Sequence, residues 1–550
     1  MTVPRIRDAG DAALLLQLDA VIDPAVNARA IAIAESIRIQ RMTGIRDVVP
    51  TYRSVSVHFD PLVTDVDMVG RALERAAADI AAGPNRASRP PIEVPVVYGG
   101  EVGPDLDEVA AFAGITPQQV VERHSARTYR VFMLGFLPGF PYMGPVAPEI
   151  AMARKATPRV RVPRGSVGIA GPQTGIYPSD SPGGWQIIGR TPVTLFDPRR
   201  TPPALFAPGD QVKFVPARVG DFEPAGAAPS QSAWGPQSPM HQTHRVITVL
   251  RPGLFTTIQD EGRWGYQALG VPVGGAMDRV SHRVANLLVG NGPDAASLEA
   301  TLLGPELRVE QDTTVAVAGA EMAATVDGAV LPPNRAVRCR RGAVIRFGER
   351  RAGMRAYIAF GGGIAVPPVL GSRSAHTRSG LGPHGRPLAA GDAIPIGPDA
   401  GPPAPAAAAD PGLTAHGGAR IRVLPGPQDD WFPRDALSAL QRARFTISSQ
   451  SDRMGYRLQG PRIARSSERE MISDAAFAGG IQVPPSGEPI LLMADRQTTG
   501  GYPQIATVIT ADLPVAAQLA PGDWIEFEVC TREGAISALV AQEGRLRAFR

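Results

Sequence analysis

The first 82 residues combine strand-like alternation with helical periodicity. The segments "AALLLQL" (12–18) and "SVSVHF" (54–59) have the apolar character of buried strands. In the two segments that follow Asp23 and Asp65, apolar residues recur at helical spacing. Each aspartate stands where the helix after it needs an N-cap. The pattern predicts a small α+β unit.

From residue 92 onward the pattern changes to short apolar runs broken by glycine and proline. Helical periodicity returns briefly, in segments that begin near Asp105, Thr116 and Asp278. Many short strands with few helices are typical of β-barrels or sandwiches. The predicted units are a small α+β domain over 1–82, a β-barrel over 92–217, a further β domain over 245–397 and a β-barrel over 419–531, with linkers at 83–91, 218–244 and 398–418.

One phrase occurs twice in the chain. Both "DSPGGWQIIGRT" (180–191) and "ADRQTTGGYPQIATVI" (494–509) place a glycine pair and an aromatic residue before an apolar run. Each phrase is followed by the same kind of ending, "APGDQVKF" at 207–214 and "APGDWIEF" at 520–527, and a weaker version, "AAGDAIPI", stands at 389–396. We interpret the repetition as a duplication of barrels. The predicted fold class is mainly β, with a small N-terminal α+β domain and tandem barrels.

Composition narrows the class of protein. The chain has 550 residues, of which 44% are hydrophobic and 20% charged, and its net charge is +4. These values indicate a multidomain globular protein, and they favour neither disorder nor nucleic-acid binding. Cys339 and Cys530 are too few for a disulfide framework, and no apolar run is long enough for a membrane span. We therefore expect a cytoplasmic protein without a membrane partner.

The scarcity of lysine excludes several functions. Lys155 and Lys213 are the only lysines, and neither follows a glycine as the lysine of a P-loop does. Neither is flanked by methionines, so covalent biotin is not expected on this chain. The sequence also lacks the G-x-S-x-G, H-E-x-x-H and C-x-x-C motifs of common hydrolases, zinc proteases and redox proteins. It does not reveal metal ligands.

The densest signal of the first half is "HSARTYRVFMLGFLPGFPYMG" (124–144), in which an aromatic loop follows a short helix. His124 is a candidate catalytic residue, and a partly buried structural histidine is an equal alternative. The glycine-rich segment 158–185 offers backbone amides and arginines that can hold an anion, although glycines also serve tight turns. Its candidate substrate- or phosphate-binding residues are Arg164, Gln173 and Tyr177.

In the second half, the segment 256–291 begins as a polar turn and continues as a helix. Asp278 is the predicted N-cap of that helix. Gln259, Asp260 and Arg263 have no such structural duty, so Asp260 is a candidate catalytic residue and the other two are candidate binding residues.

A second polar cluster follows the apolar strand "EPILLM" (488–493). Asp495 is a candidate catalytic residue, because polar clusters on loops that end strands commonly form sites. An internal ion pair between aspartate and arginine is the competing explanation. The candidate binding residues here are Arg453, Arg496, Gln497 and Tyr502.

These motifs carry a family resemblance. Residues from about 10 to 216 resemble the KipI family, or the B subunit of 5-oxoprolinase, formerly allophanate hydrolase subunit 1, through "GIRDVVPTYRSVSVHFDP", "GFLPGFPYMG" and "SPGGWQIIGRTP". Residues from about 245 to 530 resemble the KipA family, or the C subunit of 5-oxoprolinase, through "TTIQDEGRWGYQALGVPVGGAMD", "AFGGGIAVPPVLGSRS", "SDRMGYRL" and "MADRQTTGGYPQIATVI". The chain thus looks like a natural fusion of two subunits, and the resemblance implies cyclophilin-like barrels.

The resemblance also implies a function. Together with a separate LamB/YcsF-type protein, the A subunit, the chain would form an ATP-dependent 5-oxoprolinase, which opens 5-oxoproline to glutamate. ATP and Mg²⁺ are therefore implied, because phosphorylation of the lactam oxygen would activate the ring for attack by water. Arginines, turn amides and Asp260 or Asp495 are the groups that could serve this chemistry.

Two alternatives stay open. The carboxyltransferase region of urea carboxylase is built from the same two modules, and it moves CO₂ from carboxybiotin to urea. KipI and KipA proteins are also described as a regulator of a histidine kinase and its antagonist. Fusion argues against this regulator, because it would hold inhibitor and antagonist together permanently. The sequence leaves the oligomeric state open, a homo-oligomer included.

Overall fold

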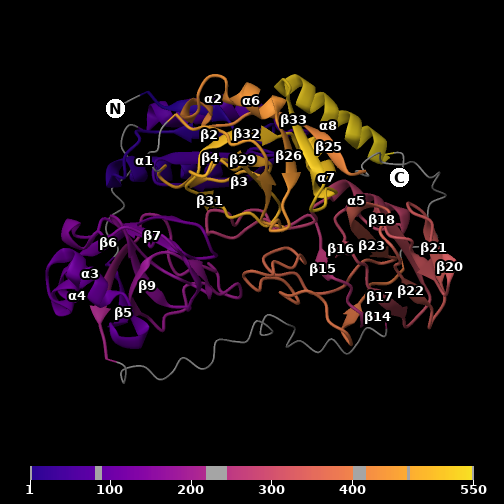
Figure 1. Ribbon diagram of the computed structural model, residues 1–550, viewed down its shortest axis with the longest axis horizontal. Coiled ribbons are helices and arrows are strands. Elements are labelled where there is room, and N and C mark those ends of the chain that lie inside the picture. Colours follow the sequence, from indigo (N-terminus) through magenta and orange to yellow (C-terminus); the bar gives the residue numbers. More distant parts are fainter. Residues whose placement is uncertain (1–2, 81–89, 219–244, 400–415, 467–470, 548–550) are drawn as a thin grey trace.

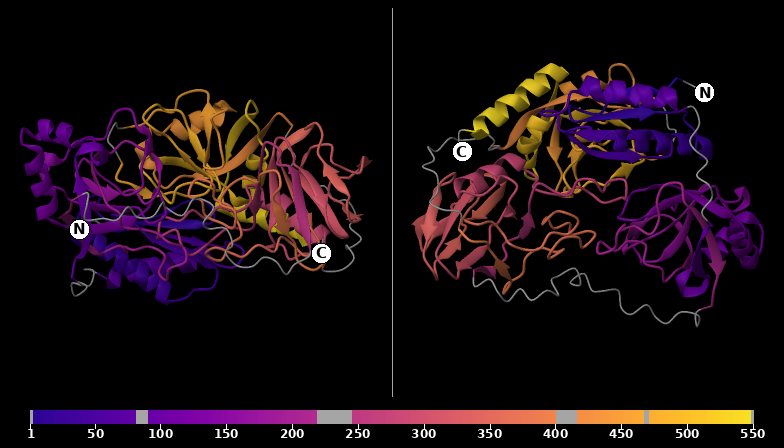
Figure 2. Two further views of the ribbon diagram at one scale, coloured as in Figure 1. Left: turned by 90° about the horizontal axis from the view of Figure 1, so that it is seen from below. Right: turned by 180° about the vertical axis from the view of Figure 1, so that it is seen from behind.

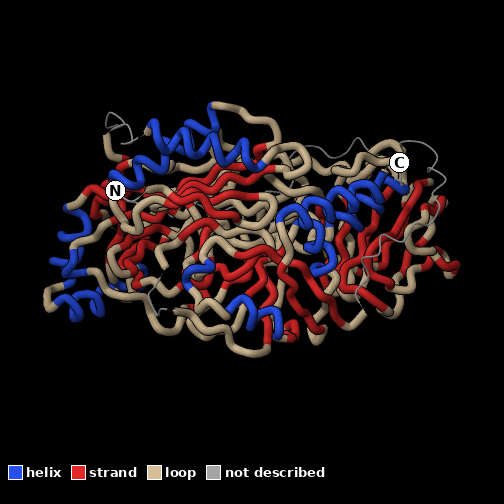
Figure 3. The backbone as a smooth tube through the Cα atoms, turned by 90° about the horizontal axis from the view of Figure 1, so that it is seen from above, coloured by secondary structure: helices blue, strands red, loops and turns tan. Residues whose placement is uncertain are grey.

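The chain folds into two closed seven-stranded barrels, a two-sheet sandwich and a small four-stranded sheet with two helices (Figure 1). Strands form most of the regular structure (Figure 3). The mainly β fold with tandem cyclophilin-like barrels is confirmed. The computed structural model describes residues 3–80, 90–218, 245–399, 416–466 and 471–547, and the predicted linkers fall mostly outside these ranges.

The N-terminal unit has the strand order β1-β2-β4-β3. The carboxylate of Asp23 accepts hydrogen bonds from the backbone of Ala25 and Val26, which confirms it as the N-cap of the first helix. The first helix contacts β3 and β4, and the second contacts β1 and β2. Its elements are β1 (Arg5–Asp8), β2 (Ala13–Gln17), α1 (Pro24–Ile39), β3 (Ile45–Pro50), β4 (Ser54–Phe59) and α2 (Val66–Asp79).

The first closed barrel, barrel 1, has the cyclic order β5-β12-β9-β10-β7-β6-β13. Its last strand, β13, lies parallel to its first, β5, and closes the barrel. The elements are β5 (Ile92–Tyr98), α3 (Leu106–Ala113), α4 (Pro117–Ala126), β6 (Thr128–Leu134), β7 (Pro141–Gly144), β8 (Arg159–Val162), β9 (Ser166–Ala170), β10 (Gln173–Ile176), β11 (Ser181–Gly183), β12 (Gln186–Arg190) and β13 (Gln211–Pro216).

The second closed barrel, barrel 2, repeats this topology in the order β25-β32-β29-β30-β27-β26-β33. The twice-used phrase marks the same place in each barrel, because it leads into β12 in one and β32 in the other. The elements are β25 (Gly418–Pro425), α6 (Ala436–Arg442), β26 (Arg444–Ile447), β27 (Gly455–Gln459), β28 (Asp474–Ala475), β29 (Gly480–Gln482), β30 (Ile490–Leu492), β31 (Thr499–Gly500), β32 (Gln504–Val508), α7 (Leu513–Ala517), β33 (Trp524–Val529) and α8 (Arg532–Arg547).

The sandwich, which lies between the two barrels in the sequence, has a different topology. One sheet has the order β20-β19-β22-β17-β14-β24 and the other β15-β16-β23-β18-β21. The weaker ending "AAGDAIPI" contains β24, which pairs antiparallel with β14, so it ends a sheet edge and does not close a barrel. The elements are β14 (Val246–Arg251), β15 (Phe255–Gln259), α5 (Arg279–Leu288), β16 (Ser297–Thr301), β17 (Glu306–Val309), β18 (Thr313–Glu321), β19 (Thr325–Val326), β20 (Ala329–Val330), β21 (Ala336–Cys339), β22 (Val344–Arg346), β23 (Ala352–Phe360) and β24 (Ala393–Pro395).

The N-terminal unit joins the two barrels. Asn27 of α1 donates a hydrogen bond of 2.9 Å to the carbonyl oxygen of Phe132 in barrel 1. The carboxylate of Asp11 accepts hydrogen bonds from the backbone N–H and the hydroxyl of Thr510 in barrel 2. Barrel 1 and the sandwich lie at opposite ends of the molecule, with barrel 2 between them (Figure 2).

An arm of the sandwich, residues 260–277, crosses to the first half of the chain. The carbonyl oxygen of Leu269 accepts a 2.8 Å hydrogen bond from Gly139 of barrel 1. Gly270 has a φ of +77°, and a Cβ there would lie 2.4 Å from the carbonyl oxygen of Leu137, so only glycine permits this approach. The arm therefore fixes the two halves against each other.

None of the helices in the described ranges is both long and apolar enough to cross a membrane.

Candidate functional site

A pocket lies where both barrels and the sandwich meet. Its volume is about 180 Å³. Loops of barrel 1 and of the sandwich extend toward each other below barrel 2 (Figure 1). The lining residues are Phe136, Leu137, Pro138, Asp180, Ser181 and Pro182 of barrel 1, Pro272, His376 and Arg378 of the sandwich, and Met454, Asp495 and Gln497 of barrel 2.

The two barrels contribute topologically equivalent loops to this pocket. In barrel 1 these are the β6–β7 loop, which carries Phe136, and the segment after β10, which carries Asp180. In barrel 2 the counterparts are the β26–β27 loop with Met454 and the β30–β31 loop with Asp495. The pocket is thus built around an approximate internal symmetry, with a mostly apolar wall from barrel 1 and a polar wall from barrel 2.

Asp495 forms a buried ion pair with Arg453. Two hydrogen bonds of 2.9 Å join the guanidinium to both carboxylate oxygens, so the pair is bidentate. Burial alone would raise the pKa of Asp495, but the nearby charges, that of Arg453 foremost, outweigh burial, and the pKa lies below its usual value. Asp495 is therefore an ionised acceptor at the pocket wall.

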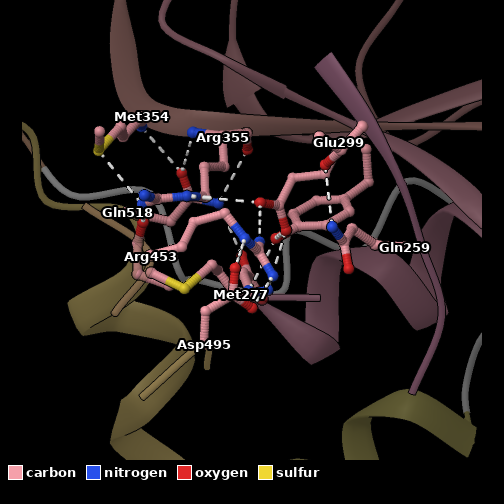
Figure 4. A network of polar contacts seen from close by, with 12 residues as sticks. Gln259, Met277, Glu299, Met354, Arg355, Arg453, Asp495 and Gln518 are labelled. Carbon is pink, nitrogen blue, oxygen red and sulfur yellow. Dashed lines mark hydrogen bonds and ion pairs between the residues drawn. The ribbon is translucent and has the colours of Figure 1, made fainter. Parts of the chain in front are cut away.

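Arg453 in turn anchors barrel 2 to the sandwich (Figure 4). It donates to Glu299 on β16 and to the carbonyl oxygen of Gly275. Glu299 also accepts from the hydroxyl of Tyr357 at 2.7 Å and from the backbone of Met277 at 2.9 Å. Burial would lower the pKa of Arg453, but Asp495 and Glu299 raise it, so the guanidinium stays charged. The predicted binding residue Arg453 acts here by holding Asp495 in place.

Asp260 lies outside the pocket lining and holds a loop that lines it. Its carboxylate accepts from the hydroxyls of Ser372 and Ser374 and from the backbone N–H groups of Gly262 and Arg373. Burial would raise the pKa of Asp260, but these hydrogen bonds lower it below its usual value. All four contacts point to a positioning role.

Gln259 and Arg263 support the same loop. The side-chain amide of Gln259 donates to the carbonyl oxygen of Ala375 at 3.1 Å. Arg263 is fully buried and donates to the carbonyl oxygen of Ser374. The three predicted residues Gln259, Asp260 and Arg263 are thus brought together, as a scaffold beneath the pocket.

The pocket residues carried by this loop were missed in the sequence. His376 is buried, and its Nδ1 lies 2.6 Å from the hydroxyl of Ser379. Burial lowers the pKa of His376. Arg378 stands two residues further on, with half of its side chain exposed. Both lie in "GSRSAHTRSG" (371–380), whose alternating polar residues between glycines were the available signal.

His124 lies inside barrel 1, away from the pocket lining. Its two ring nitrogens are 2.8 Å from the hydroxyl of Tyr98 and 2.9 Å from that of Thr174, and its ring stacks on Phe214. Burial lowers its pKa to about 3, so the ring is neutral. The structure gives His124 the contacts of a core histidine, the alternative weighed for it from the sequence.

Tyr177 and Arg164 lie behind the barrel 1 wall. Tyr177 is buried, and its ring meets that of the lining residue Phe136 edge-on at 6.2 Å between centroids. The backbone N–H of Arg164 donates to Asp180 at 2.8 Å, whereas its guanidinium bonds Thr194. Both support lining residues without touching the pocket. Gln173 lies on β10 outside the lining.

The remaining candidate residues of barrel 2 lie in different surroundings. Gln497 lines the pocket and is half-buried. Arg496 points elsewhere, with hydrogen bonds to Ala476 and Gln267. Burial lowers the pKa of Arg496 to about 10. The side chain of Tyr502 is 42% exposed and stands outside the lining.

Both halves of the chain match known protein families. A family described as "Carboxyltransferase domain, subdomain C and D" matches residues 4–206, and one described as "Carboxyltransferase domain, subdomain A and B" matches residues 269–529. The C subunit of 5-oxoprolinase from Escherichia coli (strain K12) is 40% identical over 305 residues, which cover 54% of this chain and 96% of that protein. The chain belongs to the family of carboxyltransferase-domain proteins that these two descriptions share.

Its first half is homologous to another subunit of the same enzyme. The B subunit of 5-oxoprolinase from Bacillus subtilis (strain 168) is 40% identical over 228 residues, which cover 40% of this chain and 95% of that protein. The crystal structure of TTHA0988 covers 95% of this chain and 100% of its own, at 36% identity and a TM-score of 0.82. The chain is therefore a fusion of homologues of the B and C subunits, as the motifs predicted.

Urea amidolyase is a more distant member of the family. The Lachancea kluyveri protein is 33% identical over 305 residues, which cover 51% of this chain and 17% of that protein. This chain therefore corresponds to a small part of that relative.

Residues of the pocket do not fit a magnesium nucleotide. Across the described residues, no three His, Cys, Asp or Glu side chains come together as a metal site. Both lining carboxylates, Asp180 and Asp495, are already paired with arginine. Lys155 pairs with Asp105 and Glu108, and Lys213 bonds a backbone carbonyl, so neither serves the pocket. A cavity of about 180 Å³ also lies below the roughly 300–1,000 Å³ of drug-sized ligand sites. A cavity of this volume has room only for a ligand smaller than a drug-sized molecule.

Proposed function

We propose that this chain supplies the B and C components of an ATP-dependent 5-oxoprolinase, which opens 5-oxoproline to glutamate together with a separate A subunit of the LamB/YcsF type. One observation carries the proposal: each half is about 40% identical to a 5-oxoprolinase subunit over nearly the whole length of that relative. The candidate pocket lies between these halves, which agrees with a site that needs both.

The pocket matches the chemistry of a small lactam. Phe136, Leu137 and Pro138 form an apolar wall against which ring methylenes can pack. The side-chain amide of Gln497 offers a donor and an acceptor, which complement a lactam carbonyl and N–H. Asp495, ionised and held by Arg453, adds an acceptor whose position is fixed. The described residues can thus bind and orient the substrate.

Opening an unstrained lactam is unfavourable, and ATP would supply the activation of its carbonyl group. We assign no residue of this pocket to ATP or Mg²⁺, because the pocket does not fit them. The proposal places on this chain the binding of the lactam and the exclusion of water by the apolar wall.

The decisive experiment is reconstitution. Glutamate release from 5-oxoproline and hydrolysis of ATP are measured with the purified chain, with the LamB/YcsF-type protein, and with both. We expect glutamate only when both proteins and ATP are present. Absence of turnover with a correctly folded LamB/YcsF-type protein would overturn the proposal.

A variant of the pocket tests whether turnover occurs there. Gln497→Leu removes one hydrogen-bonding group, and we expect kcat/KM to fall roughly tenfold, which is the worth of one hydrogen bond. Gln459→Leu is the matched control, because Gln459 is exposed on β27 and outside the lining. Equal activity of the two variants would place the reaction elsewhere.

A carboxyltransferase of urea carboxylase type is the second candidate. The description of the matched family and the likeness to urea amidolyase favour it. It ranks lower because that relative is less similar and matches over 17% of its length. Urea-dependent decarboxylation of carboxybiotin by the purified chain tests it. The relatives above are named as enzymes or parts of enzymes, which does not favour a kinase regulator.

A further inference from the structure

Three charged side chains line the pocket, and two of them are neutralised. Asp495 is held by two hydrogen bonds of 2.9 Å from Arg453. Asp180 accepts from Arg161, which lies 2.6 Å away, and from the backbone N–H of Arg164. The pocket therefore presents little net negative charge.

Arg378, the third, is different. The carboxylate of Asp452 lies 3.5 Å from its guanidinium, and the side chains are 50% and 52% exposed. An exposed ion pair of that length contributes little and is easily exchanged for another acceptor. Arg378 is thus a loosely paired cation in the pocket lining.

The loop that carries Arg378 is held at its start. Asp260 accepts hydrogen bonds from both serine hydroxyls of Ser372 and Ser374 and from the backbone N–H of Arg373. A network of this kind fixes the start of the loop, so that a flexible side chain projects from a defined point. The arrangement is typical of a binding residue supported from below.

A buried polar atom of another lining residue also lacks a partner among the described residues. It is the hydroxyl oxygen of Ser181, a residue 9% exposed. A buried polar group without a partner costs free energy, and such groups in native proteins call for an explanation. Because Ser181 lines the pocket, a bound ligand with a hydrogen-bonding group would supply the missing partner.

We propose that Arg378 binds the carboxylate of a small monocarboxylate whose ring packs against Phe136, Leu137 and Pro138. The planar guanidinium matches a carboxylate with two parallel hydrogen bonds. The inference rests on the proposed function in naming 5-oxoproline as that monocarboxylate. It adds that the pocket selects an anionic lactam over a neutral one.

The test compares two ligands that differ in one group. Binding of 5-oxoproline and of 2-pyrrolidinone, the same ring without the carboxylate, is measured by calorimetry on the full chain. We expect the chain to prefer 5-oxoproline, and Arg378→Gln to weaken its binding about 10- to 100-fold with 2-pyrrolidinone unchanged, since a hydrogen-bonded charge is lost. Arg378→Lys should restore part of the preference, because the charge returns without the planar fork.

Arg457→Gln is the matched control, because Arg457 is an exposed arginine on β27 outside the lining. Its affinity for both ligands should equal that of the parent chain. If Arg378→Gln keeps the preference for 5-oxoproline, or if the parent chain shows no preference, the proposed subsite is wrong.

Failure of the two proposals can be told apart. Arg378-dependent binding of 5-oxoproline without glutamate release in the reconstituted system would leave the subsite standing and overturn the oxoprolinase assignment. Glutamate release that is unaffected by Arg378→Gln at limiting substrate would overturn the subsite and leave the oxoprolinase assignment standing.

Discussion

The two barrels have one topology but different roles at the pocket. Strand for strand their orders coincide, and in both the last strand lies parallel to the first. Barrel 1 presents Phe136, Leu137 and Pro138, whereas barrel 2 presents Asp495 and Gln497. Two barrels of one topology can thus contribute different chemical groups to one pocket, because the loops vary while the strands that support them do not.

The ion pairs of the two barrels differ in the same way. Arg453 and Asp495 are 8% and 6% exposed, while Arg161 and Asp180 are 75% and 42% exposed. Low dielectric makes the first pair strong and its disruption costly, and water screens the second. In barrel 2, the charged lining residue Asp495 is thus fixed by a buried ion pair. In barrel 1, the charged lining residue Asp180 is paired at the surface.

The largest expected effect comes from breaking the buried pair. Arg453→Met leaves Asp495 buried without its cation and removes the nearer arginine of Glu299, whose second arginine, Arg355, lies 3.7 Å away, so we expect barrel 2 to lose about 3–5 kcal/mol. Arg161→Met should cost barrel 1 less than about 1 kcal/mol. Hydrogen exchange of peptides from each barrel measures both. Similar losses in the two barrels would contradict the contrast drawn above.

The aromatic residue of the repeated phrase gives the next effect. Trp185 is 6% exposed and packs edge-on against Phe140 at 5.4 Å, whereas Tyr502 is 42% exposed. We expect Trp185→Ala to destabilise barrel 1 by about 3 kcal/mol, and Tyr502→Ala to change barrel 2 by about 0.5 kcal/mol or less. Hydrogen exchange of peptides from each barrel measures both changes in stability. A large loss from Tyr502→Ala would show that the equivalent positions share a structural role.

The smallest effect, taken per pH unit, concerns the dependence of stability on pH. The pKa of His124 is lowered to about 3 by burial, below the roughly 6.5 of an unfolded chain. The unfolded state therefore binds the proton first, and barrel 1 should lose stability as pH falls from about 6.5 toward 3, by up to about 1.4 kcal/mol per unit. Barrel 2 has no histidine between residues 419 and 531.

The variant His124→Gln isolates this contribution. Barrel 1 of the variant should lose stability less steeply between pH 6 and pH 4, while barrel 2 should behave as in the parent chain. Unfolding in urea at several pH values, followed by exchange in each barrel, measures the slopes. An unchanged slope in barrel 1 would mean that His124 is not neutral in the folded state.

Much of the local structure could be predicted from the sequence. Asp23, Thr116 and Asp278 cap their helices through side-chain hydrogen bonds, as their positions before apolar periodic runs indicated. The repeated phrase located equivalent strands in two barrels. These features depend on residues close together in the chain, and their physical causes act over a few residues.

The lining of the candidate pocket was predicted in part. Asp495 and Gln497 line the pocket, and Gln259, Asp260 and Arg263 lie beneath it. His376 and Arg378 were missed, because nothing in their local sequence shows that this loop meets two barrels. Conversely, the aromatic loop that follows its helix made His124 conspicuous, although both ring nitrogens of His124 lie within hydrogen-bond distance of hydroxyls inside barrel 1.

The sequence by itself thus determined the elements, their caps and the equivalence of the barrels, because these follow from patterns of neighbouring residues. Only the tertiary structure decided which loops share a pocket, since it joins residues near 136, 180, 376 and 495 that no local rule connects. It also decided the role of each charge. Burial and pairing make Asp495 and Arg453 one fixed unit and leave Arg378 loosely paired, and both depend on where the units pack.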